Sequence, residues 1–425
     1  MGAVANAELL PGLQALPRPG GWGALRARAE VGLDELVWPD RHQETWRQTD
    51  LGGLREQDFQ PGRPVQVDIA PMILPESRGA RLVFVNGHFD PHHSCTSSLP
   101  PGVRLLNLAA ASELAPELGA LADLADPFVR LNTARFQDGA LVIVPRGLQL
   151  EVPLHVLFVA ESEEAARASL ARLFVVLERG ASATVVEEYR SRGRSFTSGV
   201  TEVLLRENAG LSHERIQRES PEAVHFSHLA ARVARDARYH SRTIAAGGRL
   251  SRSTPHVVMA EAGADLILDG LALLDRDQVA DTHSLIDHAV PDCTSRQTQR
   301  AIVDGSAVAV FNGIIYVHKD AQHTNAQQQC RGLLLSPQAR VFAKPQLEIF
   351  ADDVKCTHGA AIGQLDPEAM FYLQSRGLRP ALARNLLTYA FAADLLSGIG
   401  VPSLRRQLRQ TVLARTHAEQ LEALP

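Results

Sequence analysis

The chain has 425 residues, of which 45% are hydrophobic and 21% are charged, and its net charge is −5 at pH 7. This composition excludes disordered and collagen-like proteins and allows two or three structural units. Arginine carries nearly all of the positive charge and is scattered among acidic residues, so no basic stripe predicts a nucleic-acid surface. The only lysines are Lys319, Lys344 and Lys355.

The four cysteines lie far apart, at Cys95, Cys293, Cys330 and Cys356, which is unlike a disulfide framework. The sequence shows no secretory signal, and no apolar run approaches the roughly 18 residues that a membrane helix needs. We therefore expect a cytoplasmic protein whose thiols stay free.

Residues 1–127 are expected to form an N-terminal region of mixed helices and strands. The apolar run Leu82–Val85, followed by Asn86-Gly87, predicts a strand and a tight turn. The Ala- and Leu-rich segment from Leu106 to Leu124 predicts a helix.

Residues 128–362 read as short apolar strands, such as "ALVIVPRG" and "SAVAVFNGIIYV", separated by Gly, Asp and Asn turns. Similar turns recur at intervals of 30, 26 and 27 residues, at Gly180, Gly210, Asp236 and Gly263. One coil of a β-solenoid has about this length. Because the interval drifts after Gly263, a β-sandwich remains the alternative.

Residues 363–425 are predicted to be helical. Asp366 and Pro367 form a helix start signal, and Gly377 ends that helix. A second helix is expected from Pro380 to Ser397, and a third begins at Pro402. The expected apolar faces are Leu382, Leu386, Ala390, Ala393 and Leu396 in the second helix, and Leu404, Leu408 and Val412 in the third. These helices either cap the solenoid or dock a partner.

Common catalytic and metal-binding motifs are missing from the sequence. There is no P-loop, no dinucleotide-binding glycine pattern, no Cys-x-x-Cys and no G-x-S-x-G. "HHSC" (His92, His93, Cys95) is the nearest approach to a metal cluster. It lacks a partner cluster, so a surface loop is favoured.

The stretch "DDVKCTHGA" is the best candidate site. Cys356 and His358 are two residues apart, so in a strand they point to the same face. Thiolate and imidazole suit iron, iron–sulfur units and zinc. A buried thiol beside a hydrogen-bonded histidine at a strand end is the alternative, and residue chemistry alone favours it. The amide-rich stretch "VHKDAQHTNAQQQC", with His318, His323 and Cys330, predicts solvated polar turns.

The segment "AKPQLEIFADDVKCTHGAAIGQLDPEAMFYLQSRGL" resembles the signature of the SufD branch of the SufB/SufD family, which assembles iron–sulfur clusters. "WPDRHQETWRQTDLGGL", around Trp46, is similar to the N-terminal motif of that branch, and the match extends over nearly the whole chain. Gly359 follows His358, where the SufB branch usually has glutamate. Cys330 and Gly332 depart from the family pattern, so no role is carried over to Cys330.

The resemblance implies a mainly β fold, with a right-handed parallel β-helix core between helical regions. It also implies a complex with SufB and two copies of the ABC-type ATPase SufC, which residues 363–425 would dock. Sulfur would come from the SufS/SufE pair, and a homodimer of the isolated chain stays open. A transient iron–sulfur cluster would form at the SufB–SufD interface, with His358 and Cys356 as metal-binding residues. Reduced flavin (FADH2) is the further cofactor that the resemblance suggests.

These expectations describe a scaffold subunit and not an enzyme. The alternative is a secreted β-helix enzyme that acts on polysaccharides, but aromatic residues make up only 5% of the chain.

Overall fold

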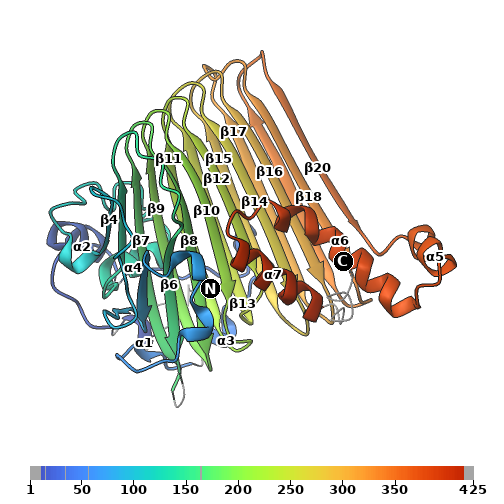
Figure 1. The fold of residues 1–425 in the computed structure, drawn as a ribbon, viewed down its shortest axis with the longest axis horizontal. Helices are drawn as coiled ribbons and strands as arrows, with labels where there is room; N and C mark the ends of the chain where they lie inside the picture. The colour runs from blue at the N-terminus through green and yellow to red at the C-terminus, as the bar shows by residue number, and fades with distance from the viewer. Residues whose placement is uncertain (1–10, 15, 34, 56, 163–164, 416–425) are drawn as a thin grey trace, which may run out of the picture.

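The computed structural model describes residues 11–415, except 15, 34, 56 and 163–164. It is a mainly β protein, in which the chain winds through a parallel β-solenoid of about eight coils (Figure 1). Helices lie beside the two ends of the solenoid. The predicted β-helix core is confirmed, and the β-sandwich alternative is wrong.

Each coil contributes one strand to each of two sheets. Sheet A runs in the order β19-β17-β15-β13-β11-β9-β7-β5-β4, and β1 pairs with β7. Its strands are β1 (Gln60–Pro61), β4 (Arg104–Asn107), β5 (Ala140–Val144), β7 (Arg167–Leu177), β9 (Ser195–Leu205), β11 (Val224–Val233), β13 (Leu250–Met259), β15 (Val279–His288), β17 (Val308–Val317) and β19 (Arg340–Ile349).

Sheet B runs in the order β20-β18-β16-β14-β12-β10-β8-β6-β2-β3. Its strands are β2 (Arg81–Val85), β3 (His88–Phe89), β6 (Leu154–Glu161), β8 (Ser182–Arg192), β10 (Gly210–Arg218), β12 (Arg238–Ala245), β14 (Asp265–Leu274), β16 (Thr294–Val303), β18 (Asn325–Leu334) and β20 (Lys355–Gly363). The strand pairs are parallel except β2 with β3 and β4 with β5.

The repeat seen in the sequence is one coil of this solenoid. Strands of sheet B stack in register, and residues at equivalent positions follow one another every 27 to 31 residues: Ser182, Gly210, Arg238, Asp265, Thr294, Asn325 and Lys355. The coils after Gly263 are slightly longer, which explains the drift of the interval. Gly180, Asp236 and Gly263 have positive φ angles of 68°, 55° and 78° at the turns. Gly and Asp suit these left-handed positions.

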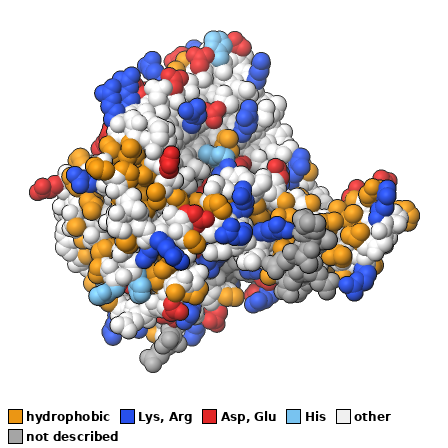
Figure 2. Space-filling model, viewed as in Figure 1, with side chains coloured by type: hydrophobic (Ala, Val, Ile, Leu, Met, Phe, Trp, Pro, Cys, Tyr) orange, Lys and Arg blue, Asp and Glu red, His pale blue; other side chains and the backbone are white. Residues whose placement is uncertain are grey.

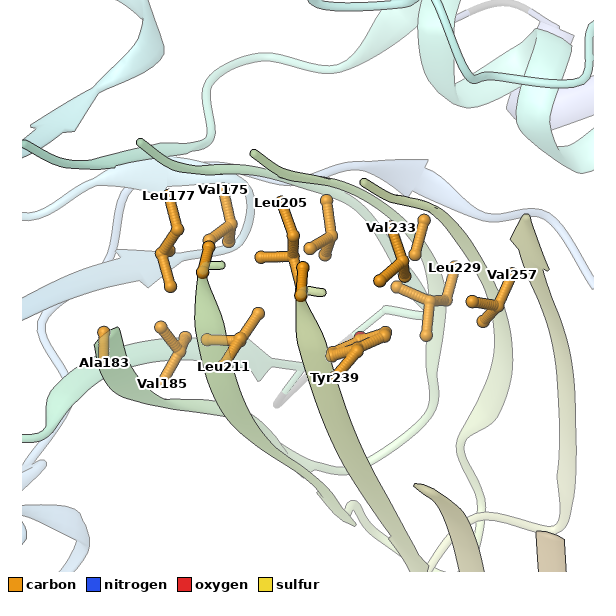
Figure 3. Close-up of a cluster of buried hydrophobic side chains, with 14 of the residues drawn as sticks. Val175, Leu177, Ala183, Val185, Leu205, Leu211, Leu229, Val233, Tyr239 and Val257 are labelled. Atoms are coloured by element: carbon orange, nitrogen blue, oxygen red, sulfur yellow. The ribbon is translucent and has the colours of Figure 1, made fainter. Parts of the chain in front are cut away.

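The core lies between the two sheets, where alternate side chains of each strand point inward (Figure 3). Stacked rows such as Val185, Leu211 and Tyr239 from sheet B face Leu177, Leu205 and Val233 from sheet A. These side chains are almost fully buried. Each coil therefore buries its apolar side chains against the next coil and across the lumen.

The N-terminal region covers the outer face of sheet A with α1 (Pro11–Gln14), α2 (Gly23–Glu30), α3 (Gly52–Arg55) and α4 (Pro127–Arg135). Trp46 is buried there, and the Arg252 guanidinium lies 3.7 Å from its ring centroid. Thr49 donates a hydrogen bond to Asp281 of β15. The motif around Trp46 thus fastens this region to the late coils.

The strand and turn predicted at Leu82–Gly87 are confirmed as β2 and its hairpin to β3, with positive φ at Asn86 and Gly87. The helix predicted from Leu106 to Leu124 is wrong. That segment ends β4, which pairs antiparallel with β5, and then forms a short 3₁₀ turn (Leu108–Ala110) and further turns. Tertiary packing overrides the helix propensity of its alanines and leucines, because Leu108 and Ala115 are buried beneath the N-terminal region.

The limits predicted for the first two C-terminal helices and the start predicted for the third are confirmed: α5 (Pro367–Ser375), α6 (Pro380–Ser397) and α7 (Pro402–Arg415). Residues 416–425 of the predicted helical region lie outside the described residues. Asp366 caps α5, because its Oδ1 accepts the Glu368 N–H at 2.9 Å. The α7 stripe is buried as expected. The face predicted for α6 is partly confirmed: Leu396 is buried, and Leu382 and Leu386 are half-buried against Leu413 of α7. Ala390 is exposed, and the other buried residues are Ala383, Thr388, Ala392 and Leu395. The reason is that α6 packs against both sheet B and α7.

Helices α6 and α7 lie along the outer face of sheet B, and α5 projects beyond it (Figure 1). They pack on the side of the solenoid and leave its last coil uncovered. Within the described residues, no helix has the length and apolar character to cross a membrane.

Candidate functional site

The candidate site lies at the open C-terminal end of the solenoid, formed by β19 and β20. Each is the last strand of its sheet, so one edge of each pairs with no other described strand. The large apolar side chains exposed at this end are Phe342, Ile349, Phe350 and Ile362. An unpaired strand edge beside exposed apolar side chains is a template for another chain.

Cys356 and His358 both lie on β20 and face the lumen side of this last coil. Their Cα partners on β18 are Ala326 and Gln328, which are buried inward-facing residues. Cys356 is half-buried and packs against the core between the sheets. His358 is two positions further along the strand, so it shares that face and is exposed because no coil follows. The prediction that the two share a face is confirmed.

The chemistry of the two side chains differs. Burial raises the pKa of the Cys356 thiol, so it is neutral at pH 7 in the isolated chain. The His358 side chain has no hydrogen-bond partner within the described residues.

The acidic residues before Cys356 take part in the stacked turns. His323 lies between two aspartates, 3.0 Å from Asp292 Oδ1 and 3.3 Å from Asp353 Oδ2. Its side chain is 62% exposed. Asp353 thus has a partner in its own turn stack, and Asp352 is exposed.

The amide-rich stretch was only partly predicted. His318 and His323 occupy polar turns as expected, but Asn325–Leu334 forms β18, where Gln328 and Cys330 are each only 3% exposed. The expectation of solvated turns is wrong for these two residues, because β20 stacks on β18 and buries its inward face. The alternation of Ala326, Gln328 and Cys330 was the available signal.

The "HHSC" segment lies at the opposite end of sheet B, beside β3. His93 Nδ1 lies 2.6 Å from Asp90 Oδ2, and Cys95 Sγ lies 3.2 Å from Ser97 Oγ. Among the described residues, no three His, Cys, Asp or Glu side chains are grouped so that they could hold a metal ion. Cys356 and His358 therefore offer two ligands at most, and further ligands would have to come from another molecule.

The four thiols are expected to react with iodoacetamide in a definite order. Cys95 should react first, because it is accessible and the Ser97 hydroxyl lowers its pKa. Cys356 should follow more slowly, and Cys293 and Cys330 last, because burial raises the pKa of Cys330 to about 11. Timed alkylation of the native chain, read by peptide mass spectrometry, measures the order. Faster labelling of Cys330 than of Cys95 would contradict this description of the lumen.

Comparison with known proteins adds two matches to family models. Residues 158–391 match the SUF system FeS cluster assembly, SufBD core domain, and residues 22–156 match the SufBD protein N-terminal region. Together these matches cover the solenoid, the N-terminal region and part of α6.

Individual relatives agree with these models. An iron–sulfur cluster assembly SufBD family protein of Synechocystis is 38% identical over 90% of this chain and 89% of its own length. The iron–sulfur cluster assembly protein SufD of Escherichia coli is 33% identical over 91% of each chain. SufD of Bacillus subtilis is 27% identical over 65% of this chain and 64% of its own length.

Proposed function

The chain belongs to the SufBD family of iron–sulfur cluster assembly proteins, and from this we propose that it is a non-catalytic, cytoplasmic scaffold subunit of the SufD type. In this proposal it joins SufB and the ATPase SufC, and a transient cluster is built where its open end meets SufB. The cluster is the cargo of the assembly and not a resident cofactor.

The open end is the observation that carries this proposal. It combines two unpaired strand edges, exposed apolar side chains, and the pair of residues whose chemistry suits iron and sulfur. Another β-helix could pair with these edges through main-chain hydrogen bonds. Its own side chains would then complete the ligand set that Cys356 and His358 leave unfinished.

The C-terminal helices support a docking role for SufC. Helix α5 has no buried residue, and Phe371 and Tyr372 are 73% and 57% exposed. Figure 2 shows hydrophobic side chains on the projecting lobe that Figure 1 identifies as α5. The chain has no P-loop of its own, so ATP binding would come from SufC.

Helices α6 and α7 are tied firmly to sheet B. Arg300 of β16 donates to the Phe391 carbonyl and to Asp394 Oδ2, each at 2.7 Å. Arg218 of β10 donates to Gln407 Oε1 of α7 at 3.0 Å. Movement of the SufC dimer would therefore act on the sheet that ends in β20. Such coupling needs an interface with two states that ATP biases.

The flavin that the resemblance suggests would have to bind outside the lumen of the solenoid. The cavity enclosed by its coils measures about 60 Å³, which holds a few water molecules and excludes a tricyclic ring. No step of the proposed cycle passes through flavin.

Replacing His358 by alanine is expected to lower the iron and acid-labile sulfide of the complex several-fold, because one ligand is lost from the shared site. The chain is co-expressed with SufB and SufC, and with SufS and SufE as the source of sulfur. The complex is then purified without oxygen. His323→Ala is the matched control, since His323 is exposed at the same end but paired with aspartates. If an intact His358→Ala complex held as much iron and sulfide as the wild type, His358 would not be a ligand of the cluster.

A further inference from the structure

A buried amide ladder lies directly beneath the open end. Gln328 Nε2 donates to Gln297 Oε1 at 2.8 Å, and Gln297 Nε2 donates to Ser284 Oγ at 2.8 Å. The three side chains are at most 3% exposed. The ladder connects β18 and β16 of sheet B with β15 of sheet A across the lumen.

Gln297 Oε1 accepts hydrogen bonds from Gln328 Nε2 and, at 3.2 Å, from the Ser284 hydroxyl, and Gln297 Nε2 also lies 2.8 Å from Ser284 Oγ. The remaining acceptor of Gln328, Oε1, is buried and has no partner within the described residues. A buried carbonyl oxygen without a hydrogen-bond donor is unfavourable, because it has lost its bonds to water. Gln328 Oε1 is therefore an acceptor in need of an N–H or O–H donor.

His358 is the residue best placed to donate a hydrogen bond to Gln328 Oε1. It is the Cα partner of Gln328 in the β18–β20 ladder, where adjacent parallel strands lie about 4.8 Å apart. Both residues belong to the same inward row. Gln328 extends toward Gly313 of β17, where an added Cβ would lie 2.5 Å from Nε2. The exposed imidazole makes no side-chain hydrogen bond among the described residues, so rotation about its side-chain dihedrals would be needed to bring it against this row.

We propose that Gln328 is a positioning residue for His358: its Oε1 accepts a hydrogen bond from one ring N–H and so selects the imidazole tautomer. The other ring nitrogen then carries its lone pair away from Gln328, toward the open end, where a metal ion would bind. Neutral imidazole ligands in proteins are oriented by such a bond at their second nitrogen. The hydrogen bond between Gln328 and His358 does not depend on the proposed function. Only its role in orienting a metal ligand rests on that proposal.

The first test is ¹⁵N NMR of the full chain labelled at histidine, with the His358 signals assigned by their loss in His358→Gln. One ring nitrogen of wild-type His358 is expected to be protonated and the other to be free at pH 8. Gln328→Leu should return His358 to the mixture of tautomers seen in an exposed histidine, whereas Gln328→Glu should retain one tautomer. Gln327→Leu is the matched control, because Gln327 adjoins Gln328 but is exposed on the outer face of β18.

A mixture of tautomers in the wild-type chain would overturn the inference even if Gln328→Leu fails to fold. An unchanged single tautomer in a folded Gln328→Leu chain would also overturn it. In the complex with SufB and SufC, Gln328→Leu is expected to lower bound iron about tenfold, and Gln328→Glu to restore it. Failure of the proposed function would appear separately, as normal iron in His358→Ala.

Discussion

Replacing Glu187 by leucine is expected to destabilise the solenoid by about 3–5 kcal/mol. Glu187 is fully buried in the lumen, 2.9 Å from His213 Nε2 and 3.2 Å from Arg215 Nε. It also accepts hydrogen bonds from Thr201 at 2.8 Å and from Tyr189. Burial raises the pKa of Glu187, but the charge of Arg215 and the hydrogen bond from His213 outweigh it and hold the pKa well below its usual range. The carboxylate is thus ionised, and leucine would leave the Arg215 charge buried without its partner.

Urea unfolding followed by circular dichroism measures this effect. Glu207→Leu is the control, because Glu207 forms an exposed pair with Arg179 at 3.4 Å, and such pairs contribute about 0–1 kcal/mol. The double variant Glu187→Leu/Arg215→Met should recover much of the loss, since an apolar pair often replaces a buried ion pair at little cost. If Glu187→Leu lowered the free energy of unfolding by less than about 1 kcal/mol, the buried network around Glu187 would not contribute to stability as expected.

Replacing Ala360 by proline is expected to weaken binding to SufB at least about tenfold while the chain stays folded. The Lys355 N–H donates to the Thr324 carbonyl at 2.8 Å, so Lys355 faces β18. Alternate residues of a parallel strand face alternate sides, which directs the N–H of Ala360 to the free edge. Proline there removes a donor from the edge and leaves the β18 ladder intact.

Ala361→Pro is the paired control, because Ala361 faces β18 and loses a bond within the solenoid. It should lower the melting temperature, whereas Ala360→Pro should not. Affinity for SufB is measured by biolayer interferometry with the folded variants. Wild-type affinity of Ala360→Pro would show that SufB does not pair with the β20 edge.

Local signals in the sequence predicted the parts of the molecule that depend on neighbouring residues. The limits of α5 follow from the Asp366 cap and Gly377, and the shared face of Cys356 and His358 follows from strand alternation. The burial of Gln328 could not be found in this way. Its neighbours Gln297 and His358 are 31 and 30 positions away, so its environment exists only once the coils stack.

The same reasoning explains the errors in the helices. The segment from Leu106 to Leu124 has helix-forming residues, but its packing partners are α2, α4 and the outer face of sheet A. The face of α6 was predicted only in part because α6 packs against two surfaces, sheet B and α7. Periodicity shows that a helix is amphipathic, but it does not show which of two neighbours takes each side.

Lysine is scarce in this chain, and all three lysine side chains lie at the open end. Lys319 follows β17, Lys344 lies on β19 and Lys355 begins β20, and all three are exposed. Apart from the α-amino group, an amine-acylating reagent thus finds its targets at this end alone. Lys344 is already paired with Glu44, so Lys319 and Lys355 should be acylated most readily. Protection of these two amines in a complex would therefore be a footprint of whatever covers the last coil.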